Sequence, residues 1–211
     1  MVPTVLVRQS TSSGKLRVVI LCAAPGKESL LADKGADSAT ALAQAGSLVV
    51  LPDLRFTGEL NYTPGKDLAR QRQAWERNGI VWGRPVPGMA STDLRAVLDG
   101  LAARADADMG RVHAVSRGSG DLAVAVLFVA ALDRRIGSAD LDLAGCCFEK
   151  RNLPLVSCVL QHGDVLQWAA LLADRKLTLR NVPGEAGPSA WLAAAFTVVG
   201  NQQGLQIDGP R

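Results

Sequence analysis

The sequence predicts an α/β protein with a mostly parallel sheet and helices on both faces. Short apolar runs alternate with segments of helical spacing over most of the 211 residues. This alternation is typical of strands joined by right-handed helical crossovers. A chain of this length can bury one sizeable core, so we expect a single domain over residues 1–211. The sequence leaves open whether that domain is cut short at one or both ends.

The first half of the chain predicts strands and helices in alternation. Residues 2–8 and 16–21 are β-rich and flank a Ser/Gly turn, which predicts a hairpin or two neighbouring strands. In chain order we then expect a helix, an apolar strand, a charged helix and an amphipathic helix over residues 29–45, 47–52, 67–78 and 90–105. Polar residues follow the strand at 47–52, at the sheet edge where α/β folds place ligands.

The second half opens with a strand–turn–helix corner at residues 112–121, V-H-A-V-S-R-G-S-G-D. A helix over 122–133 follows it. The remaining elements are a strand, an apolar run that fits strand or helix, a helix, a strand, a helix and a short strand, over residues 138–144, 153–160, 165–173, 176–181, 189–199 and 205–207. In α/β enzymes such a corner presents backbone N–H groups and a small side chain to a ligand.

Composition argues against several classes of protein. The net charge is +3 with no basic run, so we expect no nucleic-acid partner. No apolar run reaches about 18 residues, and the N-terminus lacks a secretory signal. We therefore expect a cytoplasmic protein, or an extracellular or periplasmic one if the chain derives from a longer secreted precursor. Four cysteines and two histidines lack zinc-site spacing, so no metal and no cofactor are expected.

Three glycine-rich motifs compete for the corner. A dinucleotide fingerprint would use Gly118 and Gly120, but its third glycine is Ala123, and the P-loop pattern is absent. The G-x-S-x-G nucleophile elbow fits best in shape, with Ser116 at the first glycine and Gly118 at the nucleophile. The apex of this elbow therefore has no side chain. A nucleotide-binding protein remains the alternative that rests on the two glycines alone.

Four stretches resemble a known family: A-A-P-G-K-E-S at 23–29, L-P-D-L-R-F-T-G-E at 51–59, the segment at 74–99 that contains W-E-R-N-G-I-V-W-G-R-P, and V-L-Q-H-G-D-V-L-Q-W-A-A-L-L-A-D-R-K-L-T-L at 159–179. Together they resemble the α/β-hydrolase superfamily and, within it, the bacterial acetyl xylan esterase-like branch. The resemblance implies a carboxylic ester hydrolase with a Ser nucleophile, an acid after the penultimate strand and a His after the last strand.

The triad that the resemblance implies is incomplete. Gly118 stands at the nucleophile position, Gly184 takes the place of the acid with Glu185 beside it, and no His follows the last strand. An unactivated Ser is a weak nucleophile, so we expect a catalytically impaired homologue, a pseudoenzyme. Two alternatives stay open: an active serine esterase that uses a displaced Ser119 or Ser116, and a non-catalytic carbohydrate-binding or structural module.

Several polar residues are expected around the site. Arg55 is interpreted as a structural brace held by a carboxylate, and Arg77 and Arg84 likewise with Asp93. The alternative is a cleft that binds a carbohydrate or an anion, and the partner expected for it is a carbohydrate or a small ester. The residues assigned to this cleft are Arg55, Arg77, Asn78, Arg84 and Asp164. Trp75 and Trp82 fit either sugar stacking or core packing. His113 and His162 are interpreted as packing residues, and the sequence leaves the oligomeric state open.

Overall fold

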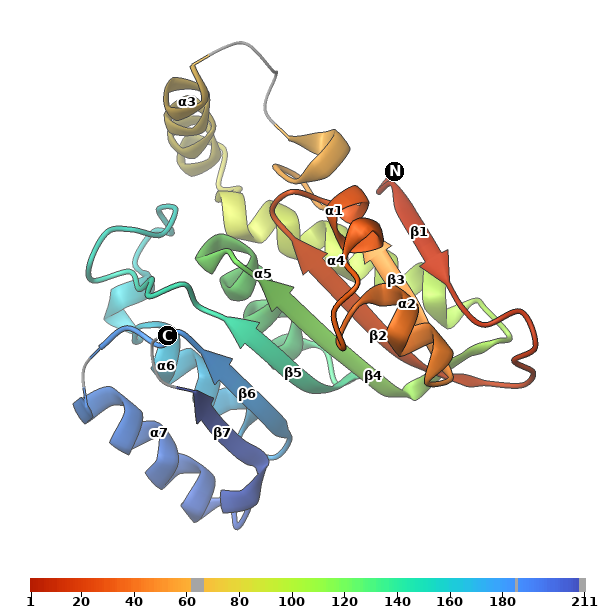
Figure 1. Ribbon diagram of the computed structural model, residues 1–211. Helices are drawn as coiled ribbons and strands as arrows, with labels where there is room; N and C mark the ends of the chain where they lie inside the picture. Colours follow the sequence, from red (N-terminus) through yellow and green to blue (C-terminus); the bar gives the residue numbers. More distant parts are fainter. Residues whose placement is uncertain (62–66, 185, 209–211) are drawn as a thin grey trace.

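The computed structural model describes residues 1–61, 67–184 and 186–208 (Figure 1). It contains a seven-stranded sheet in the order β1-β3-β2-β4-β5-β6-β7, parallel except for β1. The strands are Thr4–Val7 (β1), Leu16–Ala23 (β2), Ser47–Pro52 (β3), Ala107–Arg117 (β4), Ile136–Asp142 (β5), Lys176–Arg180 (β6) and Leu205–Asp208 (β7). The α-helices are Lys27–Ala32 (α1), Ala39–Gln44 (α2), Leu68–Val81 (α3), Val86–Ala102 (α4), Gly120–Leu132 (α5), Val165–Ala169 (α6) and Ala186–Val198 (α7).

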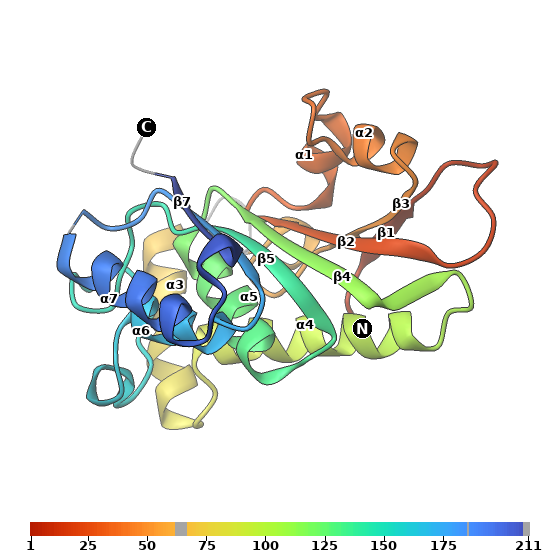
Figure 2. The ribbon, with the colours of Figure 1, turned by 90° about the horizontal axis from the view of Figure 1, so that it is seen from below.

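Helices lie on both faces of the sheet, as the sequence predicts, but they cover the two faces unequally. Figure 2 shows α1 and α2 on one side and α4 to α7 on the other. The side with α4 and α5 holds the larger core, in which residues such as Leu94, Leu98 and Leu127 are fully buried. The smaller core under α1 and α2 is built on β2 and β3 and includes Val49 and Leu51. The half of the sheet from β4 to β7 is therefore covered mainly on one face.

The burial pattern of each strand matches this uneven cover. Seven of the eight residues in β2 are buried, which is typical of a central parallel strand. In β5, buried Ala139 and Leu141 alternate with the partly exposed Ser138, Asp140 and Asp142. Such alternation with a period of two is typical of a strand in a sheet that has one buried apolar face and one solvent-exposed face. The sequence of β5 thus already suits a sheet face that no helix covers.

The N-terminal strand pairs differently from the expected hairpin. β1 runs antiparallel to β3, with Val5 opposite Leu51, and does not neighbour β2. Because β3 and β4 flank β2 on both sides, β2 has no free edge, and β1 joins the outer edge of β3. The expectation that residues 2–8 and 16–21 are neighbours was therefore wrong.

Two expected helices have different bounds. The helix expected over 29–45 is divided into α1 and α2, because Asp33 accepts the Gly35 amide at 2.9 Å and the Ser38 side chain caps α2. Such local side-chain bonds compete with continuous helix. Helix α4 begins at Val86, before the expected residue 90. Pro87 is tolerated there because the first turn needs no intrahelical N–H donor. In the ambiguous run at 153–160, a short 3-10 helix begins at Val159.

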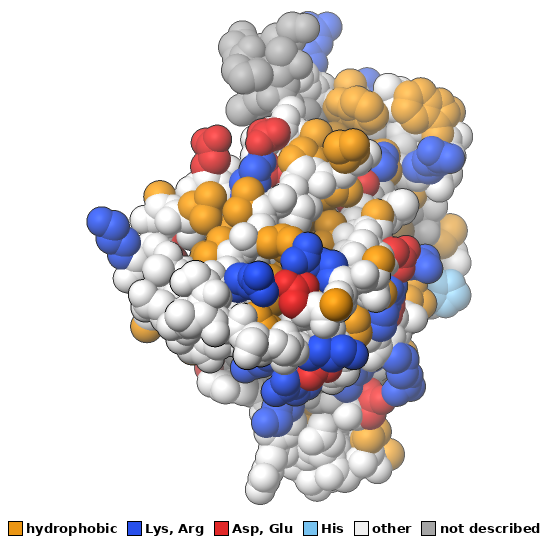
Figure 3. Space-filling model, turned by 90° about the vertical axis from the view of Figure 1, so that its right-hand side faces the viewer, with side chains coloured by type: hydrophobic (Ala, Val, Ile, Leu, Met, Phe, Trp, Pro, Cys, Tyr) orange, Lys and Arg blue, Asp and Glu red, His pale blue; other side chains and the backbone are white. Residues whose placement is uncertain are grey.

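Charges of both signs mix on the surface. Lys and Arg side chains lie among Asp and Glu on the face shown in Figure 3. Surface ion pairs include Arg104–Asp106 at 2.8 Å. Within the described ranges, every helix is too short or too polar to span a lipid bilayer.

The packing of α5 makes a prediction about stability. Leu127 is fully buried and Leu132, at the end of the same helix, is 80% exposed. Leu127→Ala should lower the free energy of unfolding by about 2–5 kcal/mol, because it leaves a cavity in the larger core. Urea denaturation measures this. Leu132→Ala is the matched control and should stay within about 0.5 kcal/mol of wild type; equal losses for both variants would contradict the described packing.

Candidate functional site

The corner between β4 and α5 has the geometry of a nucleophile elbow. β4 ends at Arg117, Gly118 has φ +64°, and Ser119 caps α5. This left-handed conformation is strained for residues with a Cβ, and Gly adopts it freely. A Cβ on Gly118 would meet no heavy atom within 4 Å, whereas one on Gly120 would lie 2.6 Å from the Cβ of Cys146. The corner therefore needs its last glycine for close packing, and the apex has room for a side chain that this chain lacks.

The two serines beside the apex have structural partners. Ser116 is buried, and its Oγ accepts a hydrogen bond from the Asp142 amide at 3.3 Å. The Ser119 Oγ accepts from the Leu122 amide at 3.4 Å, which is the role of a helix N-cap. In the described part of the chain, neither hydroxyl is hydrogen-bonded to a histidine. Both positions thus serve the corner itself.

Asp142 holds the apex of the elbow from the next strand. Its Oδ2 accepts from the Gly118 amide at 3.0 Å, and its Oδ1 accepts from the Ala144 amide at 3.0 Å and the Asn181 side chain at 2.8 Å. Burial alone would raise the pKa of Asp142, but these hydrogen bonds outweigh it and lower the pKa below the usual value. The carboxylate stays ionised and fixes the backbone of the apex.

Neither histidine lies at the elbow apex in the way a general base would. His113 is five residues before Gly118 on an extended strand, which is about 16 Å along the chain. Its Nδ1 lies 2.8 Å from the Ser138 Oγ, and the ring is half-buried on the open face of the sheet, not in the apolar core as expected. His162 contacts Trp168 edge-on, consistent with its predicted packing role. Gly184 is exposed after β6, and Glu185 lies outside the described residues.

A cavity of about 210 Å³, here called the elbow cleft, opens beside the corner. It is lined by Ala24, Arg55, Phe56, Thr57, Asn61, Arg72, Val86, Pro87, Ala90, Ser119, Asp121 and Leu122. Ala24 follows β2 and Ser119 caps α5, so the loop after β2 and the N-terminus of α5 meet at the cleft. The first N–H groups of a helix have no intrahelical acceptors and can donate to an anion.

Arg55 is braced at the edge of the elbow cleft. Its Nε and Nη2 donate to the Asp93 carboxylate, with Nη2–Oδ1 at 2.9 Å, and its own amide donates to Asp93 Oδ2 at 3.0 Å. Asp93 is buried, while the Arg55 side chain is 43% exposed. Arg55 is thus braced by a carboxylate, as predicted, and that carboxylate is Asp93, which fixes the guanidinium at the mouth of the cleft.

One aromatic residue, Phe56, lines the same cleft and contacts a second ring on α3. Phe56 has φ +70°, an uncommon and strained conformation for a bulky side chain. Its ring meets Trp75 of α3 edge-on, with ring centroids 5.6 Å apart. Trp75 itself is 42% exposed. The strained backbone therefore directs an aromatic side chain to the cleft, where it meets a second, partly exposed ring.

An ion pair joins α3 to the start of α5 within the elbow cleft. Arg72 Nη2 lies 2.8 Å from Asp121 Oδ2. Burial raises the pKa of Asp121, and the Arg72 charge opposes that rise in part. This pair, with the aromatic contact, positions α3 next to the elbow.

A buried ion pair joins the loop after β2 to the loop after β3. Lys27 Nζ lies 2.6 Å from Asp53 Oδ2 and also contacts Glu59, and the Lys27 amide donates to Asp53 Oδ1 at 2.8 Å. Gly26 and Gly58 both pack so closely on Asp53 that a Cβ on either would clash with its carboxylate. The loop after β2 and the loop after β3 are thereby held together.

The other predicted cleft residues are dispersed. Arg77 and Asn78 are exposed on α3, and Arg84 is exposed after it; none of them lines the elbow cleft. Asp93 pairs with Arg55 and not with Arg77 or Arg84 in the described part of the structure. Asp164 caps α6, accepts the Phe148 amide at 2.9 Å and borders a different cavity.

Sequence reasoning missed four residues that the structure places at the corner: Phe56, Arg72, Asp121 and Asp142. Asp142 could have been found, because it lies near the C-terminal end of the strand predicted over 138–144, at the same sheet edge as Asp53. Phe56 follows Arg55 in one of the resembling stretches, but its left-handed backbone carries no sequence signal.

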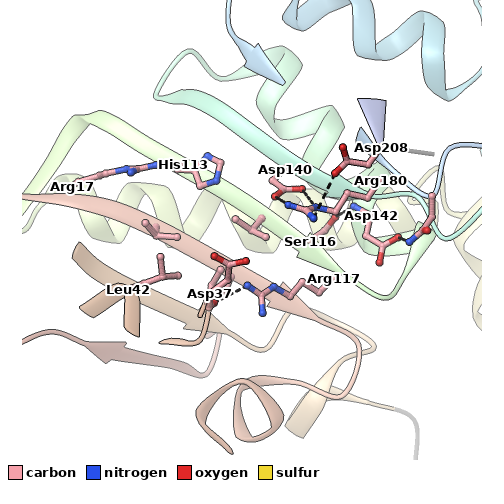
Figure 4. A pocket seen from close by; sticks show the side chains of 14 residues that line it. Arg17, Asp37, Leu42, His113, Ser116, Arg117, Asp140, Asp142, Arg180 and Asp208 are labelled. Atoms are coloured by element: carbon pink, nitrogen blue, oxygen red, sulfur yellow. Dashed lines mark hydrogen bonds and ion pairs between the residues drawn. The ribbon is translucent and has the colours of Figure 1, made fainter. Parts of the chain in front are cut away.

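A second and larger cavity, here called the sheet groove, lies on the open face of the sheet (Figure 4). Its volume is about 440 Å³. Its lining includes charged side chains from β2, β4, β5, β6 and β7, namely Arg17, His113, Arg117, Asp140, Asp142, Arg180 and Asp208. No group of three or more His, Cys, Asp or Glu residues within ranges 1–61, 67–184 and 186–208 could hold a metal ion.

Comparison of the coordinates with solved structures identifies the fold. A Bacteroides fragilis protein described as a candidate acetyl xylan esterase matches with a TM-score of 0.80 at 16% identity. The match covers 98% of this chain and 62% of the other. The chain has the α/β-hydrolase fold. This chain thus spans less than two thirds of the length of the Bacteroides fragilis protein, of which the match covers 62%.

Other α/β-hydrolases match less closely. A Klebsiella pneumoniae protein described as a candidate dienelactone hydrolase has a TM-score of 0.65 at 17% identity, over 100% of this chain and 80% of that one. A glucuronoyl esterase from Solibacter usitatus has a TM-score of 0.58 at 13% identity, over 94% and 66%. No family profile and no curated protein sequence matches the chain. The likeness is therefore one of fold.

The Lys27–Asp53 pair makes a pH prediction. Burial alone would raise the pKa of Asp53, but hydrogen bonds from Lys27 and from the Glu59 amide lower it below the usual value. The unfolded pKa is about 3.9, so the stabilisation is present above that pH and is lost as the pH falls toward the folded pKa. Asp53→Asn should lower the free energy of unfolding at pH 7 and flatten its decline between pH 5 and 2, as measured by urea denaturation.

The control for this prediction is Glu28→Gln, which removes an exposed carboxyl from the neighbouring helix α1. It should reproduce the wild-type pH profile. An Asp53→Asn profile parallel to that of wild type would show that the pair contributes nothing to the acid sensitivity of the fold.

Proposed function

We propose that this chain is an esterase-like α/β-hydrolase module that lacks ester hydrolysis of its own and uses the elbow cleft to bind carbohydrate. The observation that carries the proposal is Gly118 at the apex of an intact elbow. The elbow keeps its left-handed turn, its close helix packing and its helix N-terminus. What it lacks is the reacting group.

Hydrolysis by such an elbow needs a nucleophile, a base that takes its proton and an acid that orients the base. Ser116 and Ser119 make hydrogen bonds that support the corner, and His113 is bonded to Ser138 on the sheet face. Asp142 touches the apex but accepts bonds from two amides and Asn181. Each of these groups already makes hydrogen bonds that support the fold. This supports the loss of turnover rather than catalysis by a displaced serine.

The elbow cleft supports carbohydrate as the ligand. Phe56 and Trp75 offer aromatic surface, and the braced Arg55 offers fixed donors beside it. Stacking on aromatic rings together with planar hydrogen-bond donors suits a ring rich in hydroxyls. The fold neighbours named as acetyl xylan and glucuronoyl esterases point to the same ligand class.

Loss of hydrolysis is tested with p-nitrophenyl acetate and a fluorophosphonate probe. We expect no protein-dependent turnover and no labelled serine. Ser119→Ala and Ser116→Ala should leave both readouts at the wild-type background. Labelling or turnover that Ser119→Ala or Ser116→Ala abolishes would overturn the proposal and establish a displaced nucleophile.

Restoring the nucleophile alone should not restore activity. Gly118→Ser places a hydroxyl in open space, and the left-handed backbone should cost about 1–2 kcal/mol of folding free energy. In the described residues, neither histidine side chain makes a hydrogen bond to a residue of the apex. Hydrolysis of p-nitrophenyl acetate by Gly118→Ser should therefore stay at background. A gain of tenfold or more would show that a base serves the elbow after all.

Carbohydrate binding is tested by tryptophan fluorescence with xylo-oligosaccharides and acetylated xylan. We expect a saturable change that Trp75→Phe removes, because the Trp75 ring contacts Phe56, which lines the cleft. Trp191→Phe is the matched control, since Trp191 is 49% exposed on the distant helix α7. No saturable change, or an equal loss in both variants, would count against the elbow cleft as a carbohydrate site.

A further inference from the structure

The sheet groove exists because a parallel sheet is left open on one face. Parallel sheets are normally covered by helices on both faces. Here Leu42 of α2 and Asp37, which precedes that helix, form one wall. Apart from Val115, the residues of β4 to β7 that line the floor of the groove are polar (Figure 4). An apolar helix packed on this floor would bury those charges at high cost. The floor is therefore suited to a polar occupant.

Most charges in the sheet groove are neutralised within it. Arg180 binds Asp140 through two hydrogen bonds of 2.8 and 2.7 Å and lies 3.7 Å from Asp208. Arg117 lies 3.2 Å from Asp33 and donates to the Asp37 carbonyl at 2.7 Å. These bonds hold the acidic side chains in place, so they are not free to neutralise a further cation.

Arg17 is the exception among the cations of the sheet groove. Within the described residues it has no hydrogen bond or ion pair, although it lies on β2 in the floor of the cavity. Figure 4 shows its side chain extending toward His113 on the adjacent strand. An unpaired guanidinium beside an imidazole is a ready donor set for an anion, because a guanidinium can bind carboxylate or phosphate with two parallel bonds.

The orientation of His113 leaves one ring nitrogen for a ligand. Its Nδ1 is engaged with the Ser138 Oγ at 2.8 Å, so Nε2 is the nitrogen without a protein partner in the described structure. Burial lowers the pKa of His113, the Arg17 charge lowers it further, and the Asp140 charge opposes both. Asp140 is itself neutralised by Arg180. The free imidazole is therefore neutral near pH 7, and a bound anion would favour its protonation.

We propose that the sheet groove binds a small polar anion whose carboxylate or phosphate group pairs with Arg17 and His113. The cavity of about 440 Å³ lies in the size range of small-molecule sites. At its other end Asn181 and Asp208 present polar groups that suit the hydroxyls of a ligand. The ligand is thus an acid that carries hydroxyls. This site is separate from the elbow cleft and does not depend on the proposed carbohydrate binding.

The chain has two histidines, so NMR titration of imidazole resonances can test the site directly. His162→Gln assigns the His113 signals. Inorganic phosphate and glucuronate are added separately at constant ionic strength. A saturating ligand should raise the His113 pKa by about one, which corresponds to about tenfold tighter anion binding by the protonated form. The His162 signals of wild type should not respond.

Arg17→Gln separates the site from a general salt effect. Removing the positive neighbour should raise the His113 pKa without ligand and abolish its response to ligand. Arg134→Gln is the matched control, because Arg134 is 81% exposed on the loop after α5 and should leave the response intact. A response to phosphate alone or to glucuronate alone supports the site and assigns its anion. No response to either, or an unchanged response in Arg17→Gln, overturns it.

Discussion

The left-handed turn at Gly118 is the constraint on which the rest of the site depends. A strand that passes directly into a helix must reverse its backbone within two residues, and here φ +64° at Gly118 does so. The close approach of Gly120 to Cys146 then sets where α5 starts. Because the turn needs a backbone conformation and not a side chain, the corner forms with glycine at its apex.

Carboxylates that could serve chemistry are used for architecture throughout the site. Asp142 holds the apex amide, Asp93 braces Arg55, and Asp53 joins two loops through Lys27. Hydrogen bonds lower the pKa of Asp142 and of Asp53, which keeps both carboxylates ionised, and Asp93 is held by the guanidinium and the amide of Arg55. The elbow cleft itself is lined by an aromatic ring, two arginines and the paired Asp121. This division favours binding over turnover.

The uneven cover of the sheet gives the molecule two different surfaces. On the side of α4 and α5 the strands bury apolar residues and supply most of the stability. On the other side the charged residues of β4 to β7 largely neutralise one another, whereas Arg17 of the adjacent β2 has no such partner in the described structure. The elbow cleft opens beside the start of α5, whereas the sheet groove lies across β2 and β4 to β7. Two independent sites can therefore share one sheet.

The sequence by itself determined the α/β class, most of the strand order in the chain and the register of the elbow, because apolar periodicity and small residues are local signals. It did not determine the pairing of β1 with β3, since an edge is assigned by what the other strands leave free. Nor could it show that Asp142 meets Gly118 across 24 residues, or that Arg17 is left unpaired beside His113. Only the tertiary structure decided these contacts, because each depends on side chains brought together by the sheet from separate strands.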